Sequence, residues 1–176
     1  MSSARDKIID AAMAIVRQQG VAKLTLDEAA RNAGLSKGGV LYHFKTKDDL
    51  IRGMVERLIG QCDTLHQRYY QEEPEGPYRW ARTVVRTAFD PNGPASDPVS
   101  GALLAAVTVN PDLVAPIQAK YEQWIERVKG DSPNFEIATL VCMAMDGYLF
   151  ERLMGLQLCD AEQCERIKQT ALSLLK

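Results

Sequence analysis

The residues best suited to chemistry lie in one short segment, GLSKGGVLYHFKTKDDL, from Gly34 to Leu50. Its reactive or polar groups are two adjacent glycines, a tyrosine next to a histidine, and three lysines: Gly38, Gly39, Tyr42, His43, Lys37, Lys45 and Lys47. Ammonium, phenol and imidazole groups bind phosphate oxygens and the edges of bases. Each glycine weakens a helix by roughly 1 kcal/mol relative to alanine. The segment therefore favours close contact with a partner over helix stability.

The surrounding sequence predicts helices that would hold this segment. An amphipathic helix spans about Ser3 to Gln19 and ends at Gly20. Thr25 and Glu28 form a capping-box pattern at the start of a short helix of about 26–33, which Gly34 ends. Ser36 is the N-cap of a third helix, about 36–43. Two short helices joined by a tight turn, under a longer first helix, predict a helix-turn-helix.

A helix-turn-helix places its second helix in the major groove of DNA. Glycines at the start of that helix let the backbone approach bases and phosphates, and its free N–H groups face phosphate oxygens. We therefore expect double-stranded DNA as a partner, with Val40, Leu41 and Phe44 turned wholly or partly toward the core. The exposed contacts would come from Lys37, Gly38, Gly39, Tyr42 and His43. In the alternative, the glycines only allow close helix packing and the lysines are solvated.

Charge is distributed unevenly along the 176 residues. The net charge is −2, yet residues 1–52 carry nine basic and six acidic groups, and the remainder carries 12 basic and 17 acidic groups. A basic N-terminal part on an acidic body is compatible with an anionic partner. No apolar run approaches the ~20 residues of a membrane span. The N-terminus is unlike a signal peptide, so we expect a cytoplasmic protein with no membrane segment.

Enzyme and metal chemistry have little support in the sequence. It contains no P-loop, no G-x-S-x-G and no HExxH motif, and its carboxylates have no compelling spacing, so we expect neither an enzyme nor a cofactor. The four cysteines are Cys62, Cys142, Cys159 and Cys164. They fall within or beside helical patterns and read as reduced thiols. Cys62 and His66 have the i, i+4 spacing of two ligands, but two residues do not make a metal site.

Helical patterns continue to the end of the chain, without strand-like alternation. Thr46 caps a fourth helix to about Gln71, with Asp48 and Asp49 in its first turn. Five further helices are expected at about 80–89, 101–109, 111–130, 135–156 and 161–175, and residues 90–98 are expected as a loop. The fold class is therefore all-α, with about nine helices. We expect a DNA-binding domain at 1–48 and a helical effector-binding and dimerisation domain at 49–176.

The N-terminal 50 residues closely resemble the DNA-binding domain of the TetR family of transcriptional regulators. The resemblance is carried by LTLDEAARNAGLSKGGVLYHFKTKDDL, which matches the family pattern nearly throughout. The departures are Ala29 before Ala30, where a β-branched residue is commoner, and Gly39, where Thr, Ser or Ala often stands. The resemblance implies DNA contacts from Thr25, Ser36, Lys37, Gly39, Tyr42, His43 and Lys47. It also implies a homodimeric, ligand-responsive regulator, most often a repressor, that reads a pseudo-palindromic operator.

Beyond residue 50 the resemblance covers only helix number and size, so an effector site rests on the residues themselves. Aromatic and methionine residues gather on core-facing stripes, which predicts an apolar pocket for a small apolar or aromatic effector. Its candidate lining residues are Met54, Leu58, Trp80, Val84, Leu103, Leu104, Tyr121, Trp124, Met145 and Tyr148. Ordinary core packing is an equal alternative for each of them. Asp146 lies within the same apolar run, as a polar group for a ligand or an interface.

The last two helices are apolar on broad faces, which predicts burial on two sides. In the TetR family these helices pair with their symmetry mates in a four-helix bundle, and the pattern suits a homodimer. The expected interface residues are Leu140, Leu149, Leu153, Cys164, Ile167, Ala171 and Leu174. A monomer that buries both faces internally is the alternative. A second alternative for function is a helical small-molecule-binding protein without DNA-binding activity.

Overall fold

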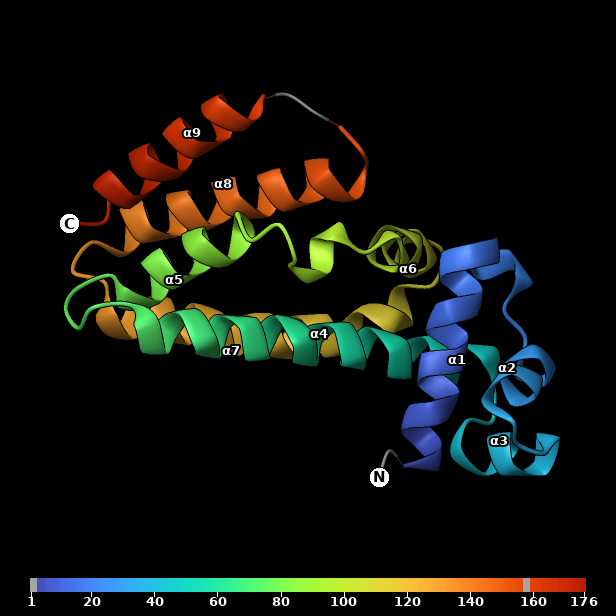
Figure 1. The fold of residues 1–176 in the computed structure, drawn as a ribbon. Helices are drawn as coiled ribbons and strands as arrows, with labels where there is room; N and C mark the ends of the chain where they lie inside the picture. The colour runs from blue at the N-terminus through green and yellow to red at the C-terminus, as the bar shows by residue number, and fades with distance from the viewer. Residues whose placement is uncertain (1–2, 157–158) are drawn as a thin grey trace. The chain divides into compact units, whose positions relative to one another are not determined.

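The computed structural model describes residues 3–156 and 159–176, and these residues form nine α-helices and no β-strand (Figure 1). The all-α prediction is confirmed over this range. The α-helices are α1 (Ala4–Gln19), α2 (Leu26–Ala33), α3 (Lys37–His43), α4 (Lys47–Glu72), α5 (Arg79–Ala88), α6 (Pro98–Val109), α7 (Ala115–Asp131), α8 (Phe135–Leu153) and α9 (Ala161–Ser173). Three short 3₁₀ helices connect them: η1 (Val21–Lys23), η2 (Pro94–Ser96) and η3 (Pro111–Val114).

Side-chain caps fix where most of the N-terminal helices begin. The Thr25 hydroxyl accepts the Glu28 N–H at 3.1 Å at the start of α2, as predicted. The reciprocal half of the predicted capping box is absent, because the Glu28 carboxylate pairs with Arg31 instead. A complete capping box occurs at α1, where Ser3 and Asp6 bond each other's backbone N–H groups.

Three predicted boundaries were wrong. The expected loop at 90–98 contains η2, and Pro98 is already the first residue of α6. The expected helix at 111–130 opens with a separate 3₁₀ turn, η3, before α7 begins at Ala115. Helix α8 ends at Leu153 rather than 156, because Gly155 adopts a left-handed conformation (φ 68°). The Leu156 and Gly155 N–H groups then bond the carbonyls of Glu151 and Arg152, as in a Schellman motif.

The chain forms two compact units. Unit 1 comprises Met1–Ile59 and Pro98–Gln118, and unit 2 comprises Gly60–Asp97 and Ala119–Lys176. Helices α4 and α7 each contribute residues to both units. The expected domains, DNA-binding at 1–48 and effector-binding at 49–176, were defined by function. That division stays a prediction.

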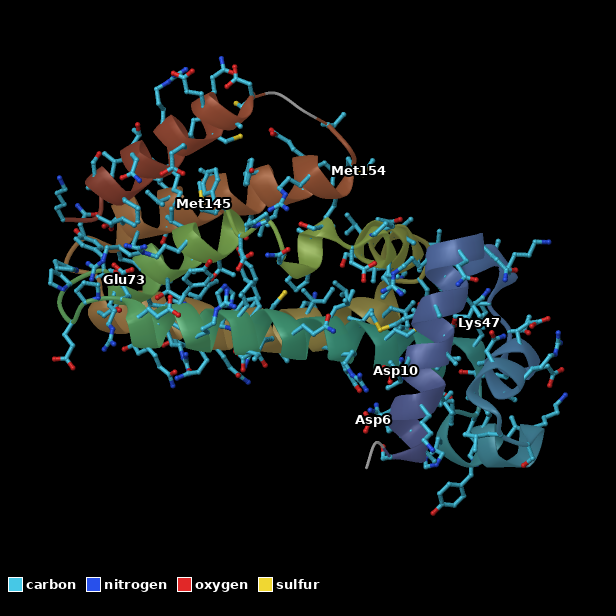
Figure 2. All side chains as sticks on the ribbon, in the orientation of Figure 1. Asp6, Asp10, Lys47, Glu73, Met145 and Met154 are labelled. Carbon is cyan, nitrogen blue, oxygen red and sulfur yellow. The ribbon has the colours of Figure 1, made fainter. Side chains whose placement is uncertain are left out.

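Unit 1 is built on α1, whose fully buried Ile8 and Ile9 pack with residues of α2, α3 and α6. Ion pairs join α1 to the first half of α4, where Arg57 contacts Asp6 at 2.5 Å and Asp10 at 3.0 Å. Asp6 and Asp10 lie one helical turn apart on α1 (Figure 2). A single guanidinium therefore binds two turns of α1.

Unit 2 has a separate apolar core, in which α5 packs against α8 and α9 (Figure 1). Trp80 and Val85 of α5 and Met145 of α8 are almost fully buried there. A buried carboxylate, Glu73, directly follows α4 and pairs with Arg82 at 2.6 Å. Within the described ranges, no helix is both long and apolar enough to cross a bilayer.

Candidate functional site

Helix α3 carries five of the eight predicted DNA-contacting residues, while Thr25, Ser36 and Lys47 lie outside it. Both ends of α3 are fixed by short-range contacts. The Ser36 hydroxyl accepts the Gly39 N–H at 3.1 Å, which caps the start of the helix. Gly34, with a left-handed φ of 67°, ends α2 and makes the tight turn between the two helices. Val40 and Phe44 are buried, as predicted, and anchor α3 to the rest of unit 1. The predicted helix-turn-helix is therefore present.

The two glycines of α3 have no packing role within the protomer. A Cβ atom at Gly39 would meet only the Ser36 hydroxyl, at an ordinary contact distance of 3.4 Å, and one at Gly38 would lie 4.0 Å from the same atom. Neither glycine has the positive φ that would exclude other residues. The alternative that they allow close helix packing is therefore not supported. What they provide is a bare stretch of backbone facing outward.

Tyr42 and His43 follow the glycines. The Tyr42 side chain is 78% exposed and contacts the His43 ring edge-on, with the ring centroids 5.1 Å apart. His43 is half-buried between Tyr42 and Phe44. Such an exposed tyrosine contributes little to the core of unit 1, and its phenol is free to meet a partner.

Lys37 and Lys47, two of the predicted phosphate contacts, each bind a partner within the protein. The sequence did not reveal these partners. The Lys37 ammonium lies 3.0 Å from the Asp27 carboxylate, and both side chains are well exposed. The Lys47 ammonium donates to the Val21 carbonyl at 2.8 Å and is half-buried. Lys37 is therefore held by an ion pair that solvent or phosphate can replace, whereas Lys47 also joins α4 to η1. Thr25 and Ser36 are exposed, and both hydroxyls already cap helices.

Phe44 connects α3 to α4 through a tight contact. A Cβ atom at Gly53 would lie 2.9 Å from the Phe44 ring, closer than real Cβ contacts come. The guanidinium of Arg5 lies 5.5 Å from the ring centroid, and its Nη2 is 3.5 Å from the same Cβ position. Gly53 is therefore required for the packing that orients the end of α3.

The ten predicted effector-pocket residues divide between the two units. Met54, Leu58, Leu103 and Leu104 belong to unit 1, and the other six belong to unit 2: Trp80, Val84, Tyr121, Trp124, Met145 and Tyr148. Neither unit by itself contains a pocket lined by all ten. Met54 and Leu103 are fully buried in the core of unit 1, which is the ordinary-packing alternative for them.

Within unit 2, an aromatic cluster forms around a buried histidine that the sequence analysis treated only as a weak metal candidate. His66 of α4 is 8% exposed and lies between Trp80 and Trp124, with ring centroids 5.4 and 4.8 Å away. Burial lowers the pKa of His66 to about 4, and Asp63 opposes this shift only in part. The imidazole is therefore neutral near pH 7. Its partners Trp80 and Trp124 lie 14 and 58 residues further along the chain, so its burial gave no local sequence signal.

A second polar group of unit 2 lies at Asp146, which the sequence singled out. The Tyr121 hydroxyl donates to the Asp146 carboxylate, and burial raises the pKa of this carboxylate. The same burial and the same hydrogen bond raise the pKa of Tyr121. The pair links α7 to α8.

Two exposed apolar stripes at heptad spacing mark the outer faces of the last two helices. The α8 stripe consists of Leu140, Met143, Gly147, Phe150 and Met154, all exposed. The α9 stripe consists of Ile167, Thr170 and Leu174, likewise exposed. Met154 marks the end of the first stripe in Figure 2. The alternating three- and four-residue spacing was visible in the sequence and would have identified these stripes.

The predicted interface set needs correction against this pattern. Leu140, Ile167 and Leu174 lie on the exposed stripes. Ala171 is only 7% exposed and Leu149 packs against the core of unit 2, so both fill the protomer's own interior. Leu153 and Cys164 are half-buried, and the Cys164 thiol accepts from Tyr148 at 3.9 Å. On α8 and α9, the broad apolar face predicted from the sequence consists of one stripe that packs inside the protomer and one that is exposed. The sequence pattern did not separate the two.

No group of three or more histidine, cysteine or carboxylate side chains is arranged for metal binding among residues 3–156 and 159–176. Burial raises the pKa of the Cys62 thiol to about 11. Cys62 is therefore protonated near pH 7.

Family models match most of this chain. The model described as "Bacterial regulatory proteins, tetR family" matches residues 8–54, which include α2, α3 and the start of α4. The model described as "Tetracyclin repressor-like, C-terminal domain" matches residues 78–176, more than half of the chain. The chain therefore belongs to the TetR family of bacterial regulatory proteins.

Curated relatives match about half of the chain. The HTH-type transcriptional regulator AcrR of Shigella flexneri is 36% identical over 81 residues, which are 46% of this chain and 38% of AcrR. The regulator TtgR of Pseudomonas putida is 29% identical over 86 residues, which are 49% of this chain and 41% of TtgR. The matched part thus spans about two fifths of each of these relatives.

Solved structures match over nearly the whole length and show the fold. The multidrug binding protein EbrR, in complex with imidazole, is 23% identical, with 100% of this chain and 97% of that chain covered and a TM-score of 0.65. A TetR-family regulator from Rhodococcus sp. is 17% identical, with 99% of each chain covered and a TM-score of 0.73. EbrR has also been solved with ethidium.

Proposed function

We propose that this protein is a ligand-responsive transcriptional repressor that binds a pseudo-palindromic DNA operator as a homodimer. The observation that carries the proposal is the bare, outward-facing backbone of Gly38 and Gly39, with Lys37 and Tyr42 exposed beside it. A helix presented in this way fits the major groove, where phosphates meet free N–H groups and lysines. The names of the relatives, transcriptional regulators in each case, support the same assignment.

Operator contacts in this proposal come from the predicted set: Thr25, Ser36, Lys37, Gly38, Gly39, Tyr42, His43 and Lys47. Lys37 would exchange Asp27 for a phosphate oxygen, and Tyr42 would contact a phosphate or a base edge. The N-terminal backbone of α3 adds N–H groups that need no side chain. The alternative, a small-molecule-binding protein without DNA-binding activity, is not favoured by a complete helix-turn-helix within the matched family region.

The α8 and α9 stripes supply the dimer interface of the proposal. Exposed large apolar side chains spaced as in a coiled coil are covered by a partner helix in most proteins that have them. A two-fold pair of α8 and α9 helices would form the four-helix bundle, and two α3 helices about 34 Å apart would then read one face of the duplex. The repressor would be cytoplasmic, because its partner is DNA.

Operator binding is tested by titrating labelled duplexes from the DNA flanking the protein's own gene, with fluorescence anisotropy as the readout. We expect binding to one duplex at least about 10³-fold tighter than to random DNA at physiological salt. The Tyr42→Ala variant should lose operator affinity while its melting temperature stays close to that of the wild type, because Tyr42 is exposed. Equal binding to all duplexes would contradict the proposal.

Dimer formation is tested by a charge on the α8 stripe. The Phe150→Glu variant should be monomeric in sedimentation analysis, since a buried carboxylate on each subunit would face an apolar partner. Val109→Glu is the matched control, because Val109 is 86% exposed and lies outside both stripes. A wild-type monomer at micromolar concentration would contradict this part of the proposal.

A further inference from the structure

Two neighbouring rings of unit 2 each carry a buried polar atom that has no hydrogen-bond partner among the described residues: His66 Nδ1 and Trp80 Nε1. The two side chains are 8% and 1% exposed, and their ring centroids lie 5.4 Å apart. Most buried polar atoms in proteins are paired, because an unpaired one loses its bonds to water without compensation. Two such atoms on neighbouring rings indicate a place where an external molecule supplies the missing partners.

Two other polar groups around this pair, the Trp124 indole and the Asp63 carboxylate, already have partners. The Trp124 indole donates to Asp63 Oδ1 at 3.2 Å, and the Lys120 ammonium lies 2.9 Å from the same carboxylate oxygen. Among the ring nitrogens of the cluster, the unmet hydrogen-bonding capacity thus lies on His66 and Trp80. Arg79 Nε, whose guanidinium lies over the Tyr70 ring, is a third buried atom without a hydrogen-bond partner.

The walls around these two atoms are flat and aromatic. Trp124 meets the His66 ring edge-on at 4.8 Å, and the ring centroid of Tyr70 lies 5.6 Å from that of Trp80. Tyr121 extends the row on the far side of Trp124, at 6.4 Å. Rings contributed by α4, α5 and α7 favour a planar ligand that stacks or packs edge-on against them.

The charges near the cluster disfavour a cationic ligand. The Arg127 guanidinium lies over the Trp80 ring, 4.4 Å from its centroid, and therefore occupies a position that an organic cation would use. The two nearby carboxylates already have partners: Asp63 is paired with Lys120, and Asp131 accepts the backbone N–H of Trp80 at 2.6 Å. His66 is neutral near pH 7, so it offers no charge for an anion to pair with.

We propose that His66 and Trp80 bind the effector of the regulator proposed above, and that this effector is a planar, uncharged molecule. It carries a carbonyl or ring-nitrogen acceptor for the Trp80 indole N–H and a polar group for His66 Nδ1. An amide within a fused ring system has both groups on one edge. That the ligand acts as an effector rests on the proposed function, but its binding to the protein can be measured without DNA.

Three two-ring probes of similar size separate the chemistry: 2-quinolinone (an uncharged lactam), naphthalene (no hydrogen-bonding group) and N-methylquinolinium (a cation). The chain has only two tryptophans, Trp80 and Trp124, so its spectrum of ¹⁵N-labelled indoles has one signal from each. We expect 2-quinolinone to shift the Trp80 N–H signal downfield and to saturate. It should bind about tenfold more tightly than naphthalene, the factor that one net hydrogen bond provides. N-methylquinolinium should bind most weakly.

Conservative ring variants test the two residues. His66→Phe and Trp80→Phe keep an aromatic ring but remove the polar atom. Each should weaken 2-quinolinone binding about tenfold and leave naphthalene binding nearly unchanged, which also reports that the cluster is still folded. Equal binding of all three probes, tightest binding of the cation, or the absence of any shift at Trp80 would overturn the proposal.

DNA titrations of the same preparations keep this inference separate from the proposed function. If the chain binds 2-quinolinone through Trp80 but shows no operator selectivity, the ligand site is supported and the proposed regulator function is contradicted. If the chain binds its operator but none of the three probes, only the proposed ligand site is contradicted. When both hold, 2-quinolinone at saturation should change operator affinity, since a ligand acts through its different affinities for two states.

Discussion

Helix α3 of unit 1 and the His66 cluster of unit 2 hold their polar groups in opposite ways. On α3 the polar groups are exposed and paired with groups that are easily exchanged, as in the Lys37–Asp27 ion pair. Around His66 they are buried, and two of them are unpaired. The first arrangement suits a large, charged partner whose affinity depends on salt. The second suits a small molecule recognised by shape and hydrogen bonds, with little dependence on salt.

The difference also concerns what each region needs from its own packing. Helix α3 has seven residues and is anchored by Val40 and Phe44, so its position depends on a few tight contacts. The His66 cluster borders the apolar core of unit 2, to which Trp80 belongs and against which Trp124 packs, and is held from three helices. A single substitution should therefore disturb α3 more selectively than it disturbs the cluster.

The largest expected effect that sharpens this comparison is the pH dependence of unit 2. The folded chain protonates His66 only near pH 4, whereas the unfolded chain does so near 6.5, so the unfolded state binds more protons between these values. Stability is thus complete above about pH 6.5 and falls as the pH is lowered, by about 2 kcal/mol at about pH 5. Asp63 opposes this shift and Arg127 and Lys120 add to it. Denaturant unfolding followed by tryptophan fluorescence measures the effect.

The His66→Phe variant is the control for that prediction, because it removes the titrating group and keeps a ring. Its unfolding free energy should be nearly flat between about pH 7 and 5. A wild-type chain that is equally flat would mean that His66 reaches solvent when protonated, and the contrast between the two regions would disappear.

The next largest effect concerns the anchoring of α3. Gly53→Ala places a Cβ atom against the buried Phe44 ring, so overpacking of about 1–3 kcal/mol outweighs the roughly 1 kcal/mol gained in helix propensity. We expect a net loss of stability and weaker operator binding, measured by denaturant unfolding and anisotropy. Gly60→Ala, on the same helix with no atom within 4 Å, should be stabilising instead. Similar behaviour of the two variants would contradict the proposed anchoring.

A smaller effect distinguishes the two lysines. Lys37→Ala should lower the salt dependence of DNA binding by about one unit of slope while leaving stability nearly unchanged, since its ion pair is exposed. Lys47→Ala should weaken binding to all sequences and reduce the slope similarly. It should also lower stability by roughly 1 kcal/mol, because it removes the bond to Val21. An unchanged slope would remove that lysine from the phosphate contacts.

The smallest expected effect comes from Asp27. Asp27→Asn releases Lys37 from its carboxylate, so DNA affinity should rise about two- to fivefold at low salt, and the gain should fade as salt increases. Asp112→Asn, which removes an acidic group near the start of η3 and outside the helix-turn-helix, serves as the control. A loss of affinity in Asp27→Asn would mean that Asp27 positions Lys37 and does not compete with phosphate.

Much of unit 1 could be predicted because its signals are local. Ser36, Gly34 and Thr46 act on the nearest backbone groups, and the structure places each where its residue type indicates. The inward direction of Val40 and Phe44 also follows from spacing along one helix. The partners of Lys37 and Lys47 did not follow, because Asp27 and Val21 lie 10 and 26 residues away.

In unit 2 the sequence predicted helices but not which of their faces turn inward. Ala171 and Leu149 were assigned to an interface, yet both fill the protomer's core, while Met143 and Phe150 were overlooked on the exposed side. An apolar stripe has the same sequence pattern whether it packs against residues of its own chain or of a partner chain. Periodicity alone therefore could not separate the two.

The sequence by itself determined the all-α class, the helix-turn-helix and the family, because caps, turns and short helical spacing act over a few residues. Only the tertiary structure decided that His66 lies between two tryptophans with its Nδ1 unpaired, and that Lys37 is held by Asp27. The physical reason is that burial and pairing depend on residues brought together by folding. The charge of a histidine and the partner of a lysine depend on the residues that folding places around them, and residue type alone does not determine either.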